Sequence, residues 1–216
     1  DTHRFNPQQR TRNWRNRLSG GAPDKPLLLF VSRLSPEKQA HLLRPILDAF
    51  PECRMAIVGD GPARSELEAL FHGTNTVFTG YLRGHDLARA YAAADMFVFP
   101  AANETLGNVV LEAMASGLPV IAARAGGPLD LVQEGKTGLF FTPDDQEALL
   151  TAVRHLLQNP DLARQMGHAG REQAQTRSWD AIFDTLLKDY QSVITRHENA
   201  RRERPRRLVV GKNFSN

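Results

Sequence analysis

The chain has 216 residues, of which 41% are hydrophobic and 24% are charged. This length and balance are typical of one globular domain with attached tails, and they exclude a disordered or fibrous protein. The net charge of +3 is small, the single cysteine, Cys53, cannot form a disulfide within the chain, and no stretch is apolar enough to span a bilayer.

Short apolar runs rich in β-forming residues alternate with helical patterns over most of the chain. We expect strands within residues 27–32, 54–61, 75–81, 95–101, 117–123 and 138–143. The helical patterns lie at 37–50, 63–71, 85–95 and 106–116. This alternation predicts an α/β fold, a Rossmann-like doubly wound sheet that is mostly parallel and covered on both faces. Such sheets bind ligands beyond the carboxyl ends of their strands, so we expect a site in the loops that follow the strands.

After residue 146 the chain becomes helical. Ser178 precedes Trp179 and fits the N-cap of the last helical pattern. We interpret the apolar positions that follow at helical spacing as packing residues. They are Phe183, Leu186, Leu187 and Tyr190.

Basic residues concentrate at the two ends of the chain, within 4–17 and 196–207. No RNP-like aromatic pattern or zinc-finger spacing accompanies them, so we do not expect nucleic acid as a partner. An anionic membrane surface would attract each Lys or Arg by about 1 kcal/mol, whereas the alternative is that both ends are solvated. The lone cysteine favours the cytoplasm, at the cytoplasmic face of a membrane if the basic ends bind one. The start DTHRFNP is neither signal-like nor a natural initiator, so we expect a longer parent chain.

Two glutamates in the segment 102–127 stand out as candidates for ligand binding. Glu104 precedes a helical pattern and Glu112 lies within it. If the helix begins near Leu106, its free N–H groups and positive dipole end can hold a diphosphate, and Gly107 lets the ligand approach the backbone. Eight residues at 1.5 Å rise place the two carboxylates about 12 Å apart along the axis, a span that suits the two ends of a sugar nucleotide. A glycosidase requires about 5 to 9.5 Å, so hydrolysis fits less well.

Together with several flanking motifs, these residues resemble the retaining family-4 glycosyltransferases of the two-domain GT-B type. The family signature is Glu, seven residues, Glu, which matches Glu104 to Glu112. The resemblance covers almost the whole chain up to the tail and continues in VSRLSPEK, VGDGP, LARAYAAADMFVFP, EAMASGLPV, ARAGG and GKTGLFF. It implies that the chain is the C-terminal, donor-binding half of a GT-B fold and belongs to a hexosyltransferase.

The resemblance also implies a division of the chain. Residues 1–20 would be the inter-domain connection and lead-in, 21–197 the Rossmann-like nucleotide-sugar-binding domain with its C-terminal helices, and 198–216 a basic tail with too few apolar residues for the core. In the family the final helix crosses back onto the first domain. An apolar face over 179–190 would therefore be left uncovered in this chain and would favour self-association.

The roles of individual residues are carried over from the family motif. The first glutamate meets hydroxyls of the transferred sugar, the backbone after it holds sugar and phosphate, and the second glutamate takes the ribose. These positions are Glu104, then Thr105, Leu106 and Gly107, then Glu112.

Further roles come from the loops after other strands. Arg33 and Lys38 match the basic pair that the family aims at the donor diphosphate, and Leu82 matches the usual contact with the base. Three residues of the motif GDGP would approach the nucleotide. They are Gly59, Asp60 and Gly61.

Each of these residues also has a structural interpretation that stays open. Glu104 could complement the helix dipole, and Glu112 could be a buried carboxylate held by hydrogen bonds. Arg33 and Lys38 could be surface charges, and GDGP is a strong turn signal by itself.

The resemblance implies transfer with retention of anomeric configuration, in which the leaving phosphate assists the acceptor. No Asp-x-Asp pair is present and the histidines lack metal-ligand spacing, so neither a metal nor a further cofactor is expected. The basic pair and the helix end would stabilise the departing diphosphate instead.

The motifs ETLG, ARAGG and GKTG resemble the branch that contains sulfoquinovosyl diacylglycerol synthases and related glycolipid or mannosyl transferases. A hexose would then move from a UDP- or GDP-sugar, which these residues do not distinguish, to an acceptor such as a lipid. Because the acceptor side lies in an N-terminal domain absent from this chain, we expect no transfer by the chain alone.

Three rival functions would require other residues or fewer of those present. A dinucleotide oxidoreductase is disfavoured because Arg64 occupies the place of the third glycine in GDGPAR. A sugar-nucleotide epimerase shares the fold but needs its own acid and base. A non-catalytic nucleotide-sugar-binding module is the third, and the presence of Glu104, Arg33, Lys38 and Glu112 argues against a degenerate domain.

Overall fold

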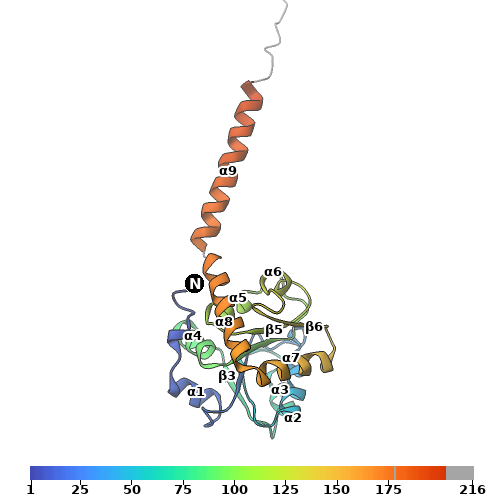
Figure 1. Ribbon diagram of the computed structural model, residues 1–216. Coiled ribbons are helices and arrows are strands. Elements are labelled where there is room, and N and C mark those ends of the chain that lie inside the picture. The colour runs from blue at the N-terminus through green and yellow to red at the C-terminus, as the bar shows by residue number, and fades with distance from the viewer. Residues whose placement is uncertain (178, 203–216) are drawn as a thin grey trace, which may run out of the picture. The chain divides into compact units, whose positions relative to one another are not determined.

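The structure is a computed structural model that describes residues 1–177 and 179–202 (Figure 1). The chain divides into two compact units, Asp1–Thr176 and Arg177–Asn216. The predicted N-cap residue, Ser178, lies outside the described residues, as do residues 203–216 of the predicted basic tail.

Within the described residues, six parallel strands form one sheet in the order β3-β2-β1-β4-β5-β6. The strands are β1 (Leu27–Val31), β2 (Arg54–Val58), β3 (Thr76–Gly80), β4 (Met96–Phe99), β5 (Val120–Ala123) and β6 (Gly138–Phe141). The strand order reverses between β1 and β4, which makes this pair the topological switch point. The predicted fold class, a Rossmann-like doubly wound parallel sheet, is confirmed.

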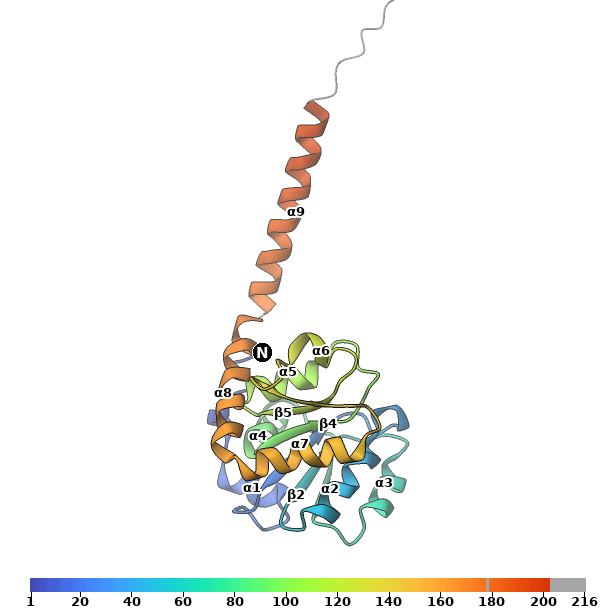
Figure 2. The same ribbon diagram turned by 45° about the vertical axis from the view of Figure 1, so that its right-hand side comes forward.

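Helices cover both faces of the sheet (Figure 2). On one side α4 packs against α1 and α5, and α5 packs against α8, whereas α2 packs against α7 on the other. The α-helices of the first unit are α1 (Arg12–Leu18), α2 (Arg44–Ala49), α3 (Arg64–Leu70), α4 (Gly84–Ala93), α5 (Asn108–Ala115), α6 (Pro128–Leu131), α7 (Gln146–Gln158) and α8 (Pro160–Thr176). Three short 3-10 turns complete it: η1 (Pro7–Gln9), η2 (Pro36–Lys38) and η3 (Ala40–Leu43).

The central strands are buried on both faces, which explains why they read as continuous apolar runs and not as alternating ones. Phe30, Phe97 and Phe99 stack across β1 and β4, with ring centroids 6.0 to 6.3 Å apart. Full burial of each such ring stabilises the fold by about 1.5–3 kcal/mol relative to exposure. Burial also raises the pKa of the Cys53 thiol to about 12, so this cysteine stays protonated.

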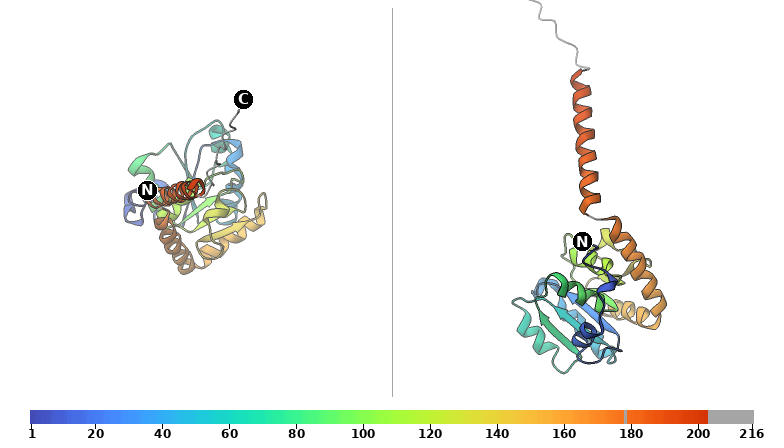
Figure 3. Two further views of the ribbon diagram at one scale, coloured as in Figure 1. Left: turned by 90° about the horizontal axis from the view of Figure 1, so that it is seen from above. Right: turned by 90° about the vertical axis from the view of Figure 1, so that its left-hand side faces the viewer.

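Residues 1–20, expected as a lead-in, pack as part of the first unit. Thr11 Oγ1 accepts the backbone N–H of Trp14 at 3.3 Å and caps α1, and Trp14 and Leu18, four residues apart on one helix face, are buried. The segment runs along α4, where η1 and α1 contact that helix (Figure 3). The amino-terminal residues are therefore a covering layer of the domain.

The edge strand β6 has its outer backbone covered by a side chain. The N–H of Phe140 lies 3.3 Å from both carboxylate oxygens of Glu134, which also forms an ion pair with Arg124. The Arg124 guanidinium lies over the Phe140 ring, 4.9 Å from its centroid. A charged cluster thus occupies this edge of the sheet.

The second unit contains the helix α9 (Trp179–Arg202), which continues five residues past the predicted start of the tail at residue 198. Its large apolar side chains are exposed, and the uncovered face expected over 179–190 stays a prediction. They are Ile182, Phe183, Leu186, Leu187, Tyr190, Val193 and Ile194. Within the described residues, every helix is too short or too polar to cross a membrane.

Candidate functional site

An ion pair joins the two loops that leave the switch point. Lys38 Nζ lies 3.0 Å from Glu104 Oε2, and both side chains are about one-fifth exposed, at 20% and 19%. Lys38 closes the turn η2 after β1, and Glu104 lies in the loop between β4 and α5. The structure thus brings together two predicted site residues that are 66 positions apart, at the carboxyl edge where ligands of such sheets bind.

The carboxylate of Glu104 is held in its charged form. Burial raises its pKa, but the hydrogen bonds from Lys38 and from the backbone N–H of Gly107 outweigh this effect, so that the pKa lies below its ordinary value. The Gly107 N–H donates to Glu104 Oε1 at 3.2 Å. Glu104 therefore presents a negative charge at the start of α5 while Lys38 balances it.

The helix α5 begins at Asn108, two residues later than the predicted start near Leu106. Gly107 has φ of 68° and takes the N-cap position, a left-handed conformation that interrupts the helix and that glycine adopts without strain. Thr105 and Leu106 consequently lie in the loop and are exposed, Leu106 at 70%. Their backbone packs against Gly127, where a Cβ would lie 2.7 Å from the carbonyl oxygen of Thr105.

The second glutamate is hydrogen-bonded within the protein. Glu112 Oε2 accepts a hydrogen bond from the Tyr91 hydroxyl at 3.0 Å. Burial raises the pKa of Glu112, and the bond from Tyr91 offsets that rise only in part. Glu112 is half-buried on α5 against α4, and its predicted contact with a ribose stays a prediction.

Arg33 does not join the Lys38–Glu104 pair. Its guanidinium is exposed and lies 3.6 Å from Glu37 on the same loop. Leu82 follows β3, which β2 separates from β1, and it is half-buried. Both residues occupy the carboxyl edge of the sheet, but neither contacts the ion pair, and their predicted roles stay predictions.

The GDG motif packs closely against the loop after β1. A Cβ on Gly59 would lie 1.8 Å from the carbonyl oxygen of Ser32, and one on Gly61 would lie 2.3 Å from that of Leu34. Asp60 accepts the Gly61 N–H and pairs with Arg64 at 2.8 Å. The glycines are thus required by protein packing, and Arg64, at the missing third glycine, is engaged in an ion pair.

Two glycines in the loop after β5, Gly126 and Gly127, are not among the predicted site residues. The Gly127 N–H donates to the carbonyl oxygen of Glu104 at 2.6 Å, and a Cβ on Gly126 would lie 2.2 Å from that same oxygen. The motif ARAGG was recognised, but only the fold shows that it fixes the backbone of the loop carrying Glu104.

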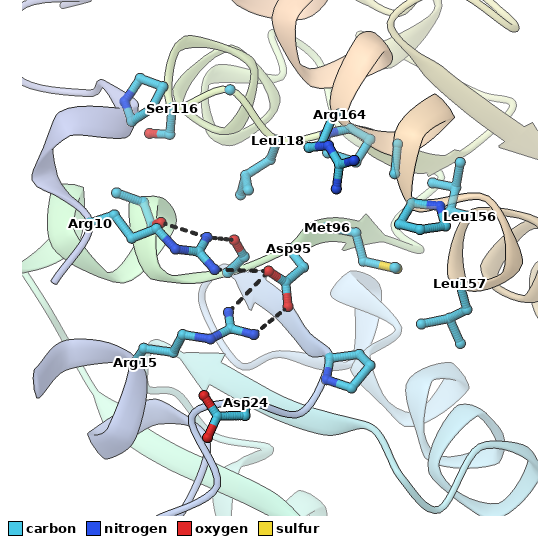
Figure 4. Close-up of a pocket in the computed structure, with 18 residues that line it drawn as sticks. Arg10, Arg15, Asp24, Asp95, Met96, Ser116, Leu118, Leu156, Leu157 and Arg164 are labelled. Atoms are coloured by element: carbon cyan, nitrogen blue, oxygen red, sulfur yellow. Dashed lines mark hydrogen bonds and ion pairs between the residues drawn. The ribbon is translucent and has the colours of Figure 1, made fainter. Parts of the chain in front are cut away.

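A cavity of about 460 Å³ lies at the amino ends of the strands, opposite the Lys38–Glu104 pair (Figure 4). Its lining includes Pro26, Asp95 and Pro119, which directly precede β1, β4 and β5. Arg10 and Arg15 point toward Asp95, with Arg15 making bonds of 3.0 and 2.7 Å to its two oxygens. This cavity lies at the amino ends of the strands, whereas ligands of such sheets bind beyond the carboxyl ends, so we do not assign the donor site to it.

Over residues 1–177 and 179–202, no group of three or more His, Cys, Asp or Glu side chains is arranged to hold a metal ion. The positive charge at the switch point comes from Lys38, and Arg33 lies on the same loop.

The sheet order and the loops at its switch point define the Rossmann-like class of domain found in GT-B glycosyltransferases. Residues 13–173 match the family model of the glycosyl transferases group 1. The chain belongs to this glycosyltransferase family.

Individual relatives agree with that assignment. The chain is 49% identical to the sulfoquinovosyl transferase SQD2 of Arabidopsis thaliana over 195 residues, which cover 89% of this chain and 38% of the relative. It is 43% identical to a GDP-mannose-dependent alpha-mannosyltransferase of Mycolicibacterium smegmatis, covering 89% of this chain and 49% of the relative. A crystal structure of Anabaena HepE in complex with UDP-glucose shares the fold, with a TM-score of 0.77, 24% identity, and coverage of 89% of this chain and 55% of that one. The chain thus spans about half the length of these proteins or less.

Proposed function

We propose that the chain is the donor-binding half of a retaining glycosyltransferase that moves a hexose from a UDP- or GDP-sugar to an acceptor. The observation that carries this proposal is the Lys38–Glu104 ion pair across the switch point. It places a cation and an anion side by side where a nucleotide sugar offers a diphosphate and a hydroxyl-bearing ring.

Lys38 supplies the charge for the diphosphate. Its ammonium is a compact cation on a flexible stem, and it can turn from Glu104 to a phosphate oxygen without moving the backbone. The amino end of α5 and the exposed Arg33 add positive potential on the same edge. This arrangement supports diphosphate binding and release without a metal ion. Independence from a metal ion is part of the proposal.

Glu104 serves the sugar. When Lys38 turns to the phosphates, the carboxylate, still fixed by the Gly107 N–H, can accept hydrogen bonds from sugar hydroxyls. The anomeric carbon would then lie between the carboxylate and the diphosphate. Retention, with the departing phosphate assisting the acceptor, is proposed on the strength of the family signature.

The acceptor is proposed from the relatives. Their names include a sulfoquinovosyl transferase and a mannosyltransferase, and a lipid acceptor at the cytoplasmic face of a membrane would suit basic chain ends. Two of the amino-terminal arginines, Arg10 and Arg15, are engaged by Asp95, so they contribute less to such a surface than their number suggests.

Titration calorimetry with UDP and GDP, in buffer containing a chelator, tests the donor site. We expect one of the two to bind, and Lys38→Met to weaken it by about 10- to 100-fold, because a hydrogen bond to a charged group is worth roughly 1.5–3 kcal/mol. Lys136→Met is the matched control, since this exposed lysine precedes β6 at the other edge of the sheet. Equal effects of the two variants, or binding that disappears with the chelator, would contradict the proposal.

A second experiment tests whether the chain holds only the donor side of the active site. The chain alone should transfer no sugar, because holding donor and acceptor together supplies roughly 7–11 kcal/mol of a barrier and this unit offers one wall of the site. Multiple turnovers by the chain alone, with lipid or sugar acceptors, would show a complete active site. Interconversion of the free nucleotide sugar would instead favour an epimerase.

A further inference from the structure

Two residues other than glycine have a left-handed backbone within the part of the chain that the structure describes. They are Gln39, with φ of 52°, and Asp144, with φ of 62°. This conformation brings Cβ close to the following carbonyl, so it is unfavourable for Gln39 and less so for Asp144, because a short Asp or Asn side chain can hydrogen-bond locally. Although 105 positions separate them, their side chains are bonded to each other: Gln39 Nε2 donates to Asp144 Oδ1 at 3.0 Å.

A further unfavourable feature lies at the same contact. The other amide atom of the glutamine, Gln39 Oε1, is buried and has no hydrogen-bond partner among the described residues. Buried polar atoms without a partner are rare because each one loses its hydration. Strain of this kind persists where the surrounding structure enforces it, and it gathers at functional sites.

The contact lies beside the Lys38–Glu104 pair. Gln39 directly follows Lys38 and forms the junction between η2 and η3, and Asp144 directly precedes Asp145, the N-cap of α7. The hydrogen bond therefore ties the loop after β1 to the loop after β6, at the amino ends of the helical segments η3–α2 and α7, which pack together.

The left-handed turn at Gln39 sets the direction in which Lys38 leaves the backbone. It ends η2 with Lys38 as the last residue, and the Gln39 N–H bonds to the carbonyl oxygen of Pro36. The ammonium of Lys38 then meets Glu104. A relaxed conformation at position 39 would rotate the whole turn that carries this lysine.

We propose that the Gln39–Asp144 hydrogen bond is a clasp that positions Lys38 for the donor diphosphate. The proposal rests on the proposed function, since the clasp acts on the lysine assigned there. Gln39 and Asp144 are positioning residues in this scheme, because they act through Lys38 and need not touch the donor.

Loss of the clasp should lower nucleotide affinity without lowering stability. Loss of a merely structural contact would lower stability. Glycine adopts the left-handed conformation freely, so Gln39→Gly and Asp144→Gly relieve the strain while removing the hydrogen bond. We expect both variants to unfold at the same temperature as the wild type or higher. Their affinity for UDP or GDP should nevertheless fall about threefold to tenfold, the range for one hydrogen bond.

The coupling between the two residues gives a second criterion. If one hydrogen bond carries the effect, the double glycine variant should bind as weakly as either single variant and no more weakly. Asp144→Asn keeps an acceptor oxygen at the same place and a residue that tolerates a left-handed backbone, so it should restore most of the affinity. Asn75→Ala is the control, since it loses a comparable amide hydrogen bond, to Pro51, at the other edge of the sheet.

A measurement without nucleotide separates failure of the clasp from failure of the proposed function. The rate of acetylation of Lys38, followed by peptide mass spectrometry with Lys136 as internal reference, should rise in both glycine variants because the ammonium is released from Glu104. An unchanged Lys38 rate together with unchanged affinity would overturn the clasp while leaving the donor site intact. A wild-type chain that binds neither nucleotide would overturn the donor site and, with it, the role of the clasp. Affinity that falls only in proportion to lost stability would make the contact a structural one.

Discussion

Replacing Asp95 with alanine tests how firmly the amino-terminal segment belongs to the domain. Asp95 precedes β4 and accepts four hydrogen bonds, of which one comes from Arg10, two from Arg15 and one, at 2.9 Å, from the backbone N–H of Leu27 at the start of β1. Arg15 is 13% exposed and Asp95 is 32% exposed, so this ion pair is neither fully buried nor fully exposed.

The size of the effect follows from that burial. Removing one partner of a fully buried pair costs about 3–5 kcal/mol, and exposed pairs are worth about 0–1 kcal/mol. We therefore expect Asp95→Ala to lower the free energy of unfolding by about 3 kcal/mol, because it leaves the Arg15 charge uncompensated and the Leu27 N–H without its acceptor. For a chain of this size the melting temperature should fall by roughly 6–12 °C.

Urea unfolding followed by circular dichroism measures this change. Asp24→Ala is the matched control, because the Arg12–Asp24 pair is 76% and 80% exposed and should contribute less than about 1 kcal/mol. If the two variants lose equal stability, the amino-terminal segment is not fastened to the sheet through Asp95.

Three further predictions concern the site itself. The pKa of Glu104 is lowered in the folded chain. Its stabilising contribution is therefore present above the ordinary carboxyl pKa of about 4.3 and is lost as the pH falls through the lower folded value. The difference in unfolding free energy between wild type and Glu104→Gln should accordingly vanish in acid. Gly127→Ala places a Cβ 2.7 Å from a backbone oxygen of the loop after Glu104 and should lower both stability and nucleotide affinity. Gly170→Ala lies inside α8 with its nearest neighbour atom at 3.5 Å, so it should leave the affinity unchanged and raise stability by about 0.5–1 kcal/mol. In Tyr91→Phe the raised pKa of Glu112 should rise further, as measured by NMR titration, because the hydroxyl that stabilises the carboxylate is gone; an unchanged value would mean that the bond is not formed in solution.

Much of the fold follows from pattern alone. The six strands lie within the predicted apolar runs, since strands buried on both faces show as uninterrupted hydrophobic segments. The start of α5 was placed two residues early, because the pattern of apolar side chains cannot show that Gly107 takes a left-handed conformation and delays the helix. The packing of residues 1–20 could not be predicted, because basic residues dominate this segment and the burial of Trp14 and Leu18 depends on α4, which lies far along the chain.

The site was predictable in part. Both Lys38 and Glu104 were expected in loops that follow strands, and in the fold their side chains form an ion pair. Their direct contact could not be predicted, because it requires the β1–β4 neighbourhood, which reverses the strand order. The packing of Gly127 against the loop of Glu104 also could not be predicted, because it depends on β4 and β5, the strands before these two loops, being neighbours in the sheet.

The cover over β6 bears on how the domain behaves at high concentration. A parallel sheet with a free outer strand offers its N–H and C=O groups to a strand of another molecule, which is how edge-to-edge aggregation begins. Here the Phe140 N–H is already bonded to Glu134, and the Arg124 guanidinium covers the Phe140 ring. An incoming strand would have to displace this charged cluster before pairing. Growth of the sheet past β6 is thereby disfavoured, and the domain can be concentrated without recruiting copies of itself along that edge.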